Sequence, residues 1–315
     1  MFRRALASWR GMRQSMLNTE ARLTRLVELA EAAAERQAAI QKAAEEQQRR
    51  LMFLDIHVSR MEHQAVLSLP RYASPLRLER FGRQYFSQND EDGVLAEIFR
   101  RIGMTSKVFV EIAAGDGKQN CTILLLRQGW RGLWVECDAS NLDSIRSAWP
   151  EDIAKGRLKL VGDFITRENL NSVIASGDFD DGIDLLVMDI DGNDYHMLNV
   201  MTARPRVICV EYYGREAPPS RWVMPYEVEP AMTWARPTGA SLQSYEELLT
   251  AKGYSLVGTN IAGMNAFFVR SDLVEGKFEA PFTAYNHFNP PRYWYPTLNF
   301  LSAWNGPPDG KPPKE

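Results

Sequence analysis

The sequence predicts an α/β fold, a doubly wound sheet of mainly parallel strands, preceded by a long helix that forms a separate part of the chain. Short apolar runs alternate with helical stretches in the second part, which is the pattern of such a sheet. One of these runs, Ile183–Ile190, is almost wholly apolar, as expected for a central strand buried on both faces. The stretch Thr19–Leu69 contains no glycine or proline, and this predicts the helix.

The helical stretch carries a heptad pattern. A helix this long cannot bury an apolar stripe alone in water, so it needs a partner. We expect residues 1–70 to form a coiled coil between copies of the chain; the alternative is a helix folded back on the following domain. The pattern is kept over more than five heptads by alternate steps of four and three, through Leu26, Ala30, Ala33, Gln37, Ile40, Ala44, Gln47, Leu51, Leu54, Val58, Met61 and Ala65.

The α/β domain is expected over residues 71–276, because Pro70 ends the helix. The proline-rich and aromatic residues 277–315 are expected to wrap its surface as a C-terminal extension. Two helices are expected, at Asn120–Gln128 and Ser241–Lys252. The expected strands are Lys107–Ile112, Gly132–Glu136, Arg157–Val161, Ile183–Ile190, Arg206–Glu211, Tyr254–Thr259 and Ala266–Arg270.

Composition restricts the class of protein. The chain has 315 residues, 45% of them hydrophobic and 24% charged, as in soluble globular proteins. A net charge of −3 gives no general attraction to nucleic acid, so we expect no nucleic-acid partner. Cys121, Cys137 and Cys209 show no paired spacing, which disfavours a zinc site and a disulfide framework. No apolar run approaches the about 20 residues of a transmembrane segment, and we expect a cytoplasmic protein.

A glycine-rich loop, Val110–Gly117, follows the first expected strand and precedes a helix. A strand, a glycine turn and a helix N-terminus together hold nucleotide-like ligands. A dinucleotide site needs a third glycine and no acidic group facing the pyrophosphate, but here Asn120 replaces that glycine. Glu111 and Asp116 would repel phosphate and suit the ammonium and sulfonium of a methionine moiety. These residues therefore predict S-adenosyl-L-methionine as the ligand.

Two later strand ends carry candidates for the rest of that ligand. Glu136 ends the second strand, where an acidic residue can accept hydrogen bonds from both ribose hydroxyls. An NAD enzyme would have the same feature, so Glu136 indicates a ribose without naming the cofactor. After the third strand, Asp163 can meet an adenine amino group and Phe164 can cover the ring. The alternative for Asp163 is a helix cap.

Several motifs in this order resemble the FkbM-like group of class I methyltransferases. The similarity spans about residues 84–270 and implies a seven-stranded Rossmann-like sheet with an antiparallel last strand, and S-adenosylmethionine as methyl donor. It also implies cofactor contacts from Gln88, Ala113, Gly115, Gly117 and Asn120. Ala113 departs from the pattern, which has glycine there. The motifs are Tyr85–Gly93, Phe109–Glu111, Gly115–Gly117, Asn120–Thr122, Asp189–Tyr195, Val210–Tyr212 and Asn265–Val269.

The ends of the fourth and fifth strands carry the candidates for chemistry. Asp189, Asp191, His196 and Glu211 fall at this edge, which faces the ligand in open α/β sheets. One explanation is a Mg²⁺ site formed by Asp189 or Asp191 with Glu211. The other is metal-free catalysis with Asp189 or His196 as general base. A neighbouring residue, Asp194, is a candidate N-cap of the following helix, and His196 has the alternative of a packing role.

The segment Tyr212–Pro237 has no regular period and is expected to be a lid. Its aromatic residues and arginines suit a sugar-containing acceptor that carries an acidic group. The resemblance to FkbM-like methyltransferases implies the substrate class, and we expect an O-methyltransferase that acts on a sugar hydroxyl of a polysaccharide, glycolipid or glycosylated natural product. A non-catalytic scaffold recruited through its coiled coil and an NAD-dependent oxidoreductase are the alternatives. The lid residues are Arg215, Arg221, Arg236, Trp222, Tyr226 and Trp234.

Overall fold

The computed structural model describes residues 2–180, 182–228 and 237–292. It divides into two compact units, residues 1–58 and residues 59–315. The lid residues Trp234 and Arg236 and the extension from Tyr293 onward lie outside the described residues. No helix in the described part of the chain is long and apolar enough to cross a membrane.

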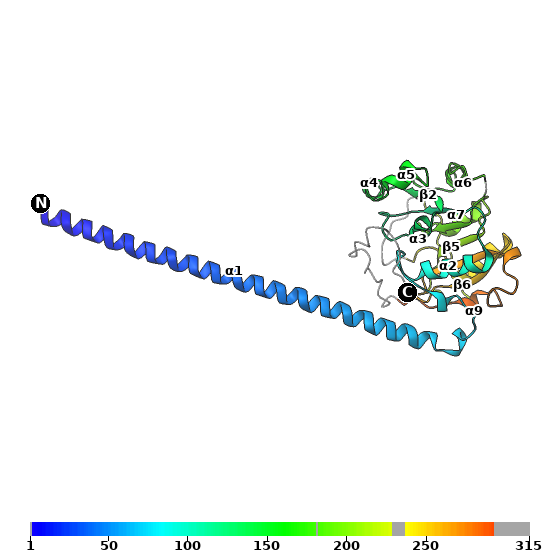
Figure 1. Ribbon diagram of the computed structural model, residues 1–315, viewed down its shortest axis with the longest axis horizontal. Coiled ribbons are helices and arrows are strands. Elements are labelled where there is room, and N and C mark those ends of the chain that lie inside the picture. Colours follow the sequence, from blue (N-terminus) through cyan, green and yellow to red (C-terminus); the bar gives the residue numbers. More distant parts are fainter. Residues whose placement is uncertain (1, 181, 229–236, 293–315) are drawn as a thin grey trace. The chain divides into compact units, whose positions relative to one another are not determined.

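The helix α1 spans Phe2–Leu67 (Figure 1). It covers most of residues 1–70, where the sequence predicted a long N-terminal helix, and it includes Gly11. Gly11 lies at an open helix surface, so it interrupts no packing. The helix ends three residues before Pro70, since a residue that precedes proline is disfavoured in the helical conformation.

Residues 59–292 contain a seven-stranded sheet of order β3-β2-β1-β4-β5-β7-β6. β7 runs antiparallel to both β5 and β6, and the other pairs are parallel. This confirms the Rossmann-like, class I methyltransferase fold that the sequence predicted. The strands are β1 Val108–Ile112, β2 Arg131–Glu136, β3 Leu158–Gly162, β4 Leu185–Met188, β5 Val207–Glu211, β6 Tyr254–Thr259 and β7 Asn265–Arg270.

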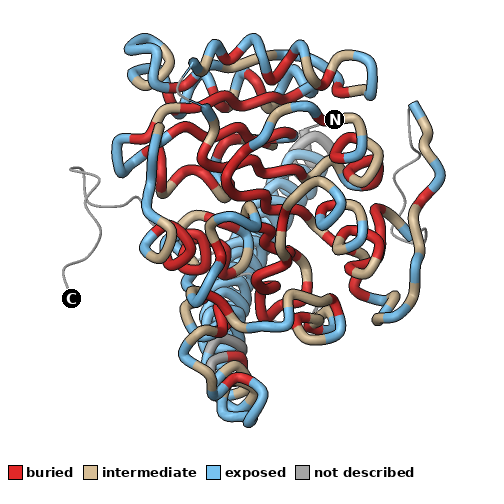
Figure 2. Tube along the Cα trace, turned by 90° about the vertical axis from the view of Figure 1, so that its right-hand side faces the viewer, coloured by how far each residue is buried: buried red, intermediate tan, exposed pale blue. Residues whose placement is uncertain are grey.

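Two hydrophobic clusters cover the two faces of this sheet. The buried residues gather in the middle of the domain (Figure 2). Alternate residues of β1 serve alternate faces: Val110 and Ile112 belong to one cluster and Phe109 to the other. Helices from both sides therefore enclose the sheet. They are α2 Glu91–Ile102, α3 Ile123–Arg127, α4 Ala139–Ala148, α5 Pro150–Ala154, α6 Leu170–Ala175, α7 Asp194–Val200, α8 Leu242–Ala251 and α9 Ala284–His287.

The segments that precede and follow the sheet in the sequence are hydrogen-bonded to each other beside β6. Asn289, beyond α9, is buried and donates from Nδ2 to the Thr259 hydroxyl at 3.0 Å. Arg71 donates to the carbonyl of Phe288 at 3.0 Å, and Tyr72 donates to the Asn289 side chain. The described part of the C-terminal extension is therefore packed into the domain together with the segment that follows α1.

Candidate functional site

The glycine loop turns through three residues with positive φ: Ala113 at 60°, Gly115 at 57° and Gly117 at 75°. Gly115 and Gly117 adopt this conformation at no steric cost, whereas Ala113 pays about 1–2 kcal/mol. Surrounding groups fix the loop: the Ala114 amide donates to Val135 O at 3.0 Å, and Asn120 Nδ2 donates to Ala114 O at 2.6 Å. Because Asn120 belongs to this turn, α3 begins later than the sequence predicted.

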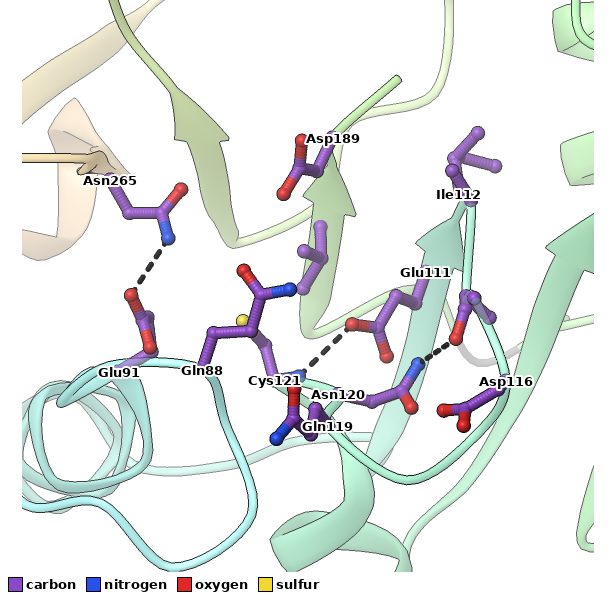
Figure 3. A pocket seen from close by; sticks show the side chains of 14 residues that line it. Gln88, Glu91, Glu111, Ile112, Asp116, Gln119, Asn120, Cys121, Asp189 and Asn265 are labelled. Atoms are coloured by element: carbon purple, nitrogen blue, oxygen red, sulfur yellow. Dashed lines mark hydrogen bonds between the residues drawn. The ribbon is translucent and has the colours of Figure 1, made fainter. Parts of the chain in front are cut away.

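A cavity of about 170 Å³ opens beside the loop, at the carboxyl ends of β1 and β4 (Figure 3). Three carboxyl groups from separate elements face it, those of Glu91, Glu111 and Asp189. The other polar side chains of its wall are amides, apart from Asp116 and Cys121. Such a wall accepts hydrogen bonds and positive charge. The lining residues are Gln88, Glu91, Glu111, Ile112, Ala113, Ala114, Gly115, Asp116, Gln119, Asn120, Cys121, Val187, Asp189 and Asn265.

Glu111 comes from β1 and is buried, and burial raises its pKa to about 7. Its Oε1 accepts a hydrogen bond from the Cys121 amide at 3.0 Å, and the Thr122 hydroxyl donates to Oε2. The carboxyl group therefore ties the strand to the start of α3 while one edge faces the cavity (Figure 3). A bound cation would favour its ionised form.

Glu91 is the acidic lining residue that the sequence analysis did not predict as part of the site. It begins α2 and is buried, and its Oε1 accepts hydrogen bonds from Asn260 Nδ2 and Asn265 Nδ2, both at 2.8 Å. Asn89 donates its amide to Oε2 at 3.0 Å. In the sequence, the acidic run that contains Glu91 points to the site only through the family resemblance. An acidic residue in the first turn of a helix usually interacts with the helix dipole. This common role gave no reason to assign Glu91 to a site.

Two of the amide side chains in the cavity wall, those of Asn120 and Gln88, belong to the predicted site. Asn120 is buried, and its Oδ1 has no hydrogen-bond partner within the described residues. A buried acceptor without a partner is costly, and a ligand N–H can satisfy it. Gln88, which the resemblance implied as a cofactor contact, also lines the cavity.

Glu136, the predicted ribose partner, holds the loop in place in this structure. Its Oε2 accepts the Gly115 amide at 2.7 Å, and its Oε1 accepts the amides of Cys137 and Asp138 at 2.9 and 2.8 Å. A carboxylate has about four acceptor positions, so capacity for a further donor remains. Glu136 is not among the residues that line the cavity.

Asp163 and Phe164 follow β3 and are exposed, outside the cavity. The Asp163 amide donates to Glu136 O at 3.1 Å, so the predicted ribose and adenine residues are neighbours along the edge of the sheet. Asp163 Oδ2 accepts from Asn169 Nδ2 at 3.3 Å, before α6. Asp163 therefore belongs to the turn that leads into this helix and is not its N-cap, which is Asn169.

Asp116, the second predicted partner of the ammonium, lines the cavity but forms an ion pair with Lys118 at 2.7 Å. Its side chain is 43% exposed, so a neighbouring cation and water already compensate its charge. Glu91 and Glu111 are buried and form no ion pair with any residue that the structure describes, so they are better placed to attract a cationic ligand.

Asp189, Asp191 and Glu211 come together at the ends of β4 and β5, with carboxylate oxygens within 4.8 Å of one another. Burial, followed by the charges of Asp194 and Asp191, raises the pKa of Asp189 well above its ordinary value. Burial and the charge of Asp189 do the same for Glu211. Asp189 also lines the cavity, so this acidic cluster is continuous with it.

The structure corrects the expected cap of α7. Asp194 is the first residue of this helix, and its carboxylate accepts the amides of Ile190 at 2.8 Å and Gly192 at 2.9 Å. It therefore braces the turn after β4, where Asp191 has a φ of 57°. Asn193 is at the N-cap position, but its side chain donates to Glu227 O at 2.6 Å instead.

His196, the other predicted base, does not line the cavity. Its Nε2 lies 2.7 Å from Met224 O, and this contact requires a proton on Nε2. The ring centroid lies 5.5 Å from that of Tyr226. These contacts favour the packing role of His196 that the sequence left open.

The segment after β5 packs on the domain where it is described. Arg221, a predicted acceptor contact, forms an ion pair with Glu247 of α8 at 2.7 Å. The Trp222 ring lies against Tyr213, with centroids 5.0 Å apart. The guanidinium of Arg167, after β3, lies 3.7 Å from the centroid of Tyr226. Arg221 is already paired with Glu247, whereas Arg167 is exposed and stacks on the Tyr226 ring. Arg167 is therefore the better candidate for contact with an acidic group of a ligand.

No family model and no curated protein sequence matches the chain. Solved structures do match it, among them the glycopeptide N-methyltransferase MtfA, at 18% identity and a TM-score of 0.36, covering 57% of this chain and 90% of that one. The N-terminal domain of EvdMO1 with SAH bound is 13% identical, with a TM-score of 0.36 and coverage of 61% and 90%. The methyltransferase domain of bacterial CtHen1-C is 15% identical, with a TM-score of 0.36 and coverage of 56% and 95%. The strand order of the sheet, rather than these distant likenesses, establishes the fold.

Proposed function

We propose that the chain is an S-adenosylmethionine-dependent methyltransferase. The observation that carries this proposal is the cavity wall, in which Glu91, Glu111 and Asp189 converge at the carboxyl ends of β1 and β4. Ligands of open α/β sheets bind at this edge. Uncompensated carboxyl groups there favour a ligand with an ammonium and a sulfonium and disfavour a pyrophosphate.

The cofactor fits the site in two parts. The cavity of about 170 Å³ is smaller than the about 300–1,000 Å³ of sites for whole drug-sized ligands. It suits the amino-acid end, with the unpartnered Asn120 Oδ1 and Glu111 as acceptors. The nucleoside would then lie at the open edge of the sheet beyond Gly115, in contact with Glu136, Asp163 and Phe164. Bound there, S-adenosylmethionine supplies an activated methyl group.

For the chemical step we propose transfer to a hydroxyl of a sugar-containing acceptor, with Asp189 as general base. A base works best when its pKa lies near the working pH, and burial beside other carboxyl groups raises the pKa of Asp189. Positive charge in the adjoining cavity would favour the ionised form that accepts the proton. Asp191 is the second catalytic candidate, since it lies beside Asp189 and is exposed.

A Mg²⁺ ion is the alternative means of activating the hydroxyl. Asp189, Asp191 and Glu211 offer the hard oxygen ligands that this ion prefers. Burial and the charges of neighbouring carboxyl groups raise the pKa values of Asp189 and Glu211, and a divalent cation would offset this repulsion. In a turnover assay, a chelator abolishes activity if the ion is needed and leaves it unchanged if Asp189 acts alone.

We also propose that α1 assembles copies of the chain. At the end of α1 within the second unit, Ser59 is buried and His63 is half-buried, on the face opposite the seam. Met61 is 70% exposed and Ala65 is exposed, and both continue the predicted seam. The domain therefore leaves the seam uncovered at this end, which favours a second copy over a helix folded back.

Light scattering tests the oligomer. The full chain is expected to exceed the mass of one copy, and L51E/L54E in the seam is expected to dissociate it. M52E/F53E is the matched control, because these residues are also exposed but lie off the seam. A monomeric full chain would contradict this part of the proposal.

Calorimetric titration tests the main proposal against its two alternatives. We expect S-adenosylmethionine to bind and NAD not to bind. Binding of NAD alone would instead indicate an oxidoreductase. Binding of S-adenosylmethionine without transfer to any sugar-containing acceptor would favour the scaffold, and binding of neither would contradict the cofactor assignment.

A further inference from the structure

The first turns of α1 differ in charge from the rest of the helix. Residues 1–19 contain four arginines and no acidic residue, whereas residues 20–67 contain eight acidic and seven basic residues. In the later part, neighbouring charges pair along the helix, as Arg25 does with Glu28 and Arg50 with Glu46. The early part holds no carboxylate with which Arg10 and Arg13 could pair.

This basic segment presents one apolar face. Trp9, Met12 and Met16 are three and four residues apart, so they share one side of the helix, and they are 60%, 60% and 69% exposed. Leu17 widens this face and is 49% exposed. A helix with aromatic and long apolar residues on one face and arginines around it is typical of segments that lie in a membrane interface.

The same three residues continue the heptad steps back from Leu26, so spacing alone does not distinguish a lipid surface from a second copy. Charge does. A parallel pair would place two segments of like charge, each with four arginines and no acidic residue, side by side. An anionic bilayer offers the complementary charge, and each basic residue near it contributes about 1 kcal/mol.

The side chain of Arg13 fits this environment. Its guanidinium lies 5.9 Å from the centroid of the Trp9 ring, so it extends along the apolar face. Long basic side chains at an interface place their carbon chain on apolar groups and their charged end among headgroups. Tryptophan rings also favour the headgroup level.

We propose that residues 2–18 are an amphipathic anchor that binds the surface of an anionic bilayer. The seam from Leu23 onward then serves the contact between copies, and the basic segment serves the lipid. The inference rests on the charge and exposure of this segment alone and does not depend on the proposed methyl transfer.

Vesicle flotation of the full-length protein tests the anchor. Binding is expected with vesicles of phosphatidylcholine mixed with phosphatidylserine, weakening at high salt, and little binding is expected with phosphatidylcholine alone. The R10Q/R13Q variant is expected to bind about thirtyfold more weakly, from about 1 kcal/mol for each arginine. The matched control K42Q/R49Q removes the same charge from the balanced part of α1 and is expected to bind as the unmodified protein does.

Circular dichroism and light scattering accompany each variant, so that lost helix or lost assembly is distinguished from lost lipid contact. Absence of flotation with phosphatidylserine vesicles at low salt would overturn the anchor. Equal weakening by both charge pairs would also overturn it, because net charge rather than this segment would then control binding. A change in oligomer mass without a change in flotation would assign the segment to the coiled coil instead.

Discussion

Strand β4 has an aspartate at each end, and the two carboxyl groups lie in contrasting surroundings. Asp184, before the strand, is fully buried and pairs with Arg206 at 2.8 Å. It also accepts hydrogen bonds from Thr105 Oγ1 and from the amides of Thr105, Ser106 and Lys107. Asp189, after the strand, lies instead among other carboxyl groups.

The pKa values record this difference. Burial would raise the pKa of Asp184, but the hydrogen bonds from Arg206 and Thr105 lower it below its ordinary value. Burial and neighbouring carboxylates raise the pKa of Asp189 with nothing of this strength to oppose them. The aspartate at the amino end of the strand is held by an ion pair and hydrogen bonds, and the aspartate at the carboxyl end is the one that we propose for a role in the site.

The largest expected effect is on stability, at the amino end. D184N leaves the buried Arg206 without its ion partner, and we expect a loss of about 3–5 kcal/mol in the free energy of unfolding. Urea denaturation measures it. D189N is the matched substitution at the other end and is expected to cost less than about 1 kcal/mol at pH 7. An equal loss of unfolding free energy in the two variants would contradict the proposed difference between Asp184 and Asp189.

The next effect is on turnover, at the carboxyl end. D189N removes the proposed base, and a positioned base contributes about 10²- to 10⁴-fold to a rate. We expect methyl transfer to fall by about that factor, with a smaller change in the affinity for S-adenosylmethionine. Retention of more than about a tenth of the rate would assign the base to another residue.

The contrast between the two edges can be sharpened by pH. The lowered pKa of Asp184 stabilises the fold above the ordinary aspartate pKa of 3.8, and this stability is lost in more acidic solution. Glu111 acts in the opposite direction. Its pKa is raised from 4.5 to about 7, so its contribution is present below pH 4.5 and is lost as the pH rises to about 7, by up to about 3 kcal/mol.

Urea denaturation of E111Q at pH 5 and pH 8 is the measurement. We expect the variant to lose less stability between these pH values than the unmodified protein does. The same decline in both proteins would show that Glu111 is ionised throughout, contrary to the buried environment described above.

The smallest expected effect concerns the glycine loop. E136A removes the acceptor of the Gly115 amide and a proposed ribose partner, so we expect S-adenosylmethionine to bind about tenfold to a hundredfold more weakly. D138A, two residues further on, removes the N-cap of α4 and is expected to cost about 1 kcal/mol of stability without changing this affinity. If D138A weakened the binding of S-adenosylmethionine as much as E136A does, the lower affinity would not be specific to the Glu136 side chain.

The fold was largely predictable because apolar runs and turn residues are local signals, and β6 matches its expected range at both ends. The helix starts were less predictable. Asn120 lies before α3 rather than in it because its side chain binds Ala114 O, and no local propensity shows such a contact. The long helix predicted over residues 1–70 is found as α1, and it continues through Gly11 because one exposed glycine costs only about 1 kcal/mol in a long helix.

The candidate site was predictable where it follows the strands. Glu111 and Asp189 were found because they end or follow apolar strands at the edge that binds ligands. Glu91 was missed because it reaches the cavity from α2, which precedes the whole sheet, through contacts with Asn260 and Asn265 far along the chain. His196 was placed at the site from its position in the sequence, but its ring turns to Met224 O.

The central claim is that the acidic cavity holds the amino-acid end of S-adenosylmethionine. The most direct test is a calorimetric comparison of S-adenosylhomocysteine with 5′-methylthioadenosine, which keeps the nucleoside and the sulfur but lacks the amino-acid end. We expect S-adenosylhomocysteine to bind at least about a hundredfold more tightly, as about 2.7 kcal/mol from charge-assisted hydrogen bonds requires. Equal affinities, or failure of both to bind, would contradict the account.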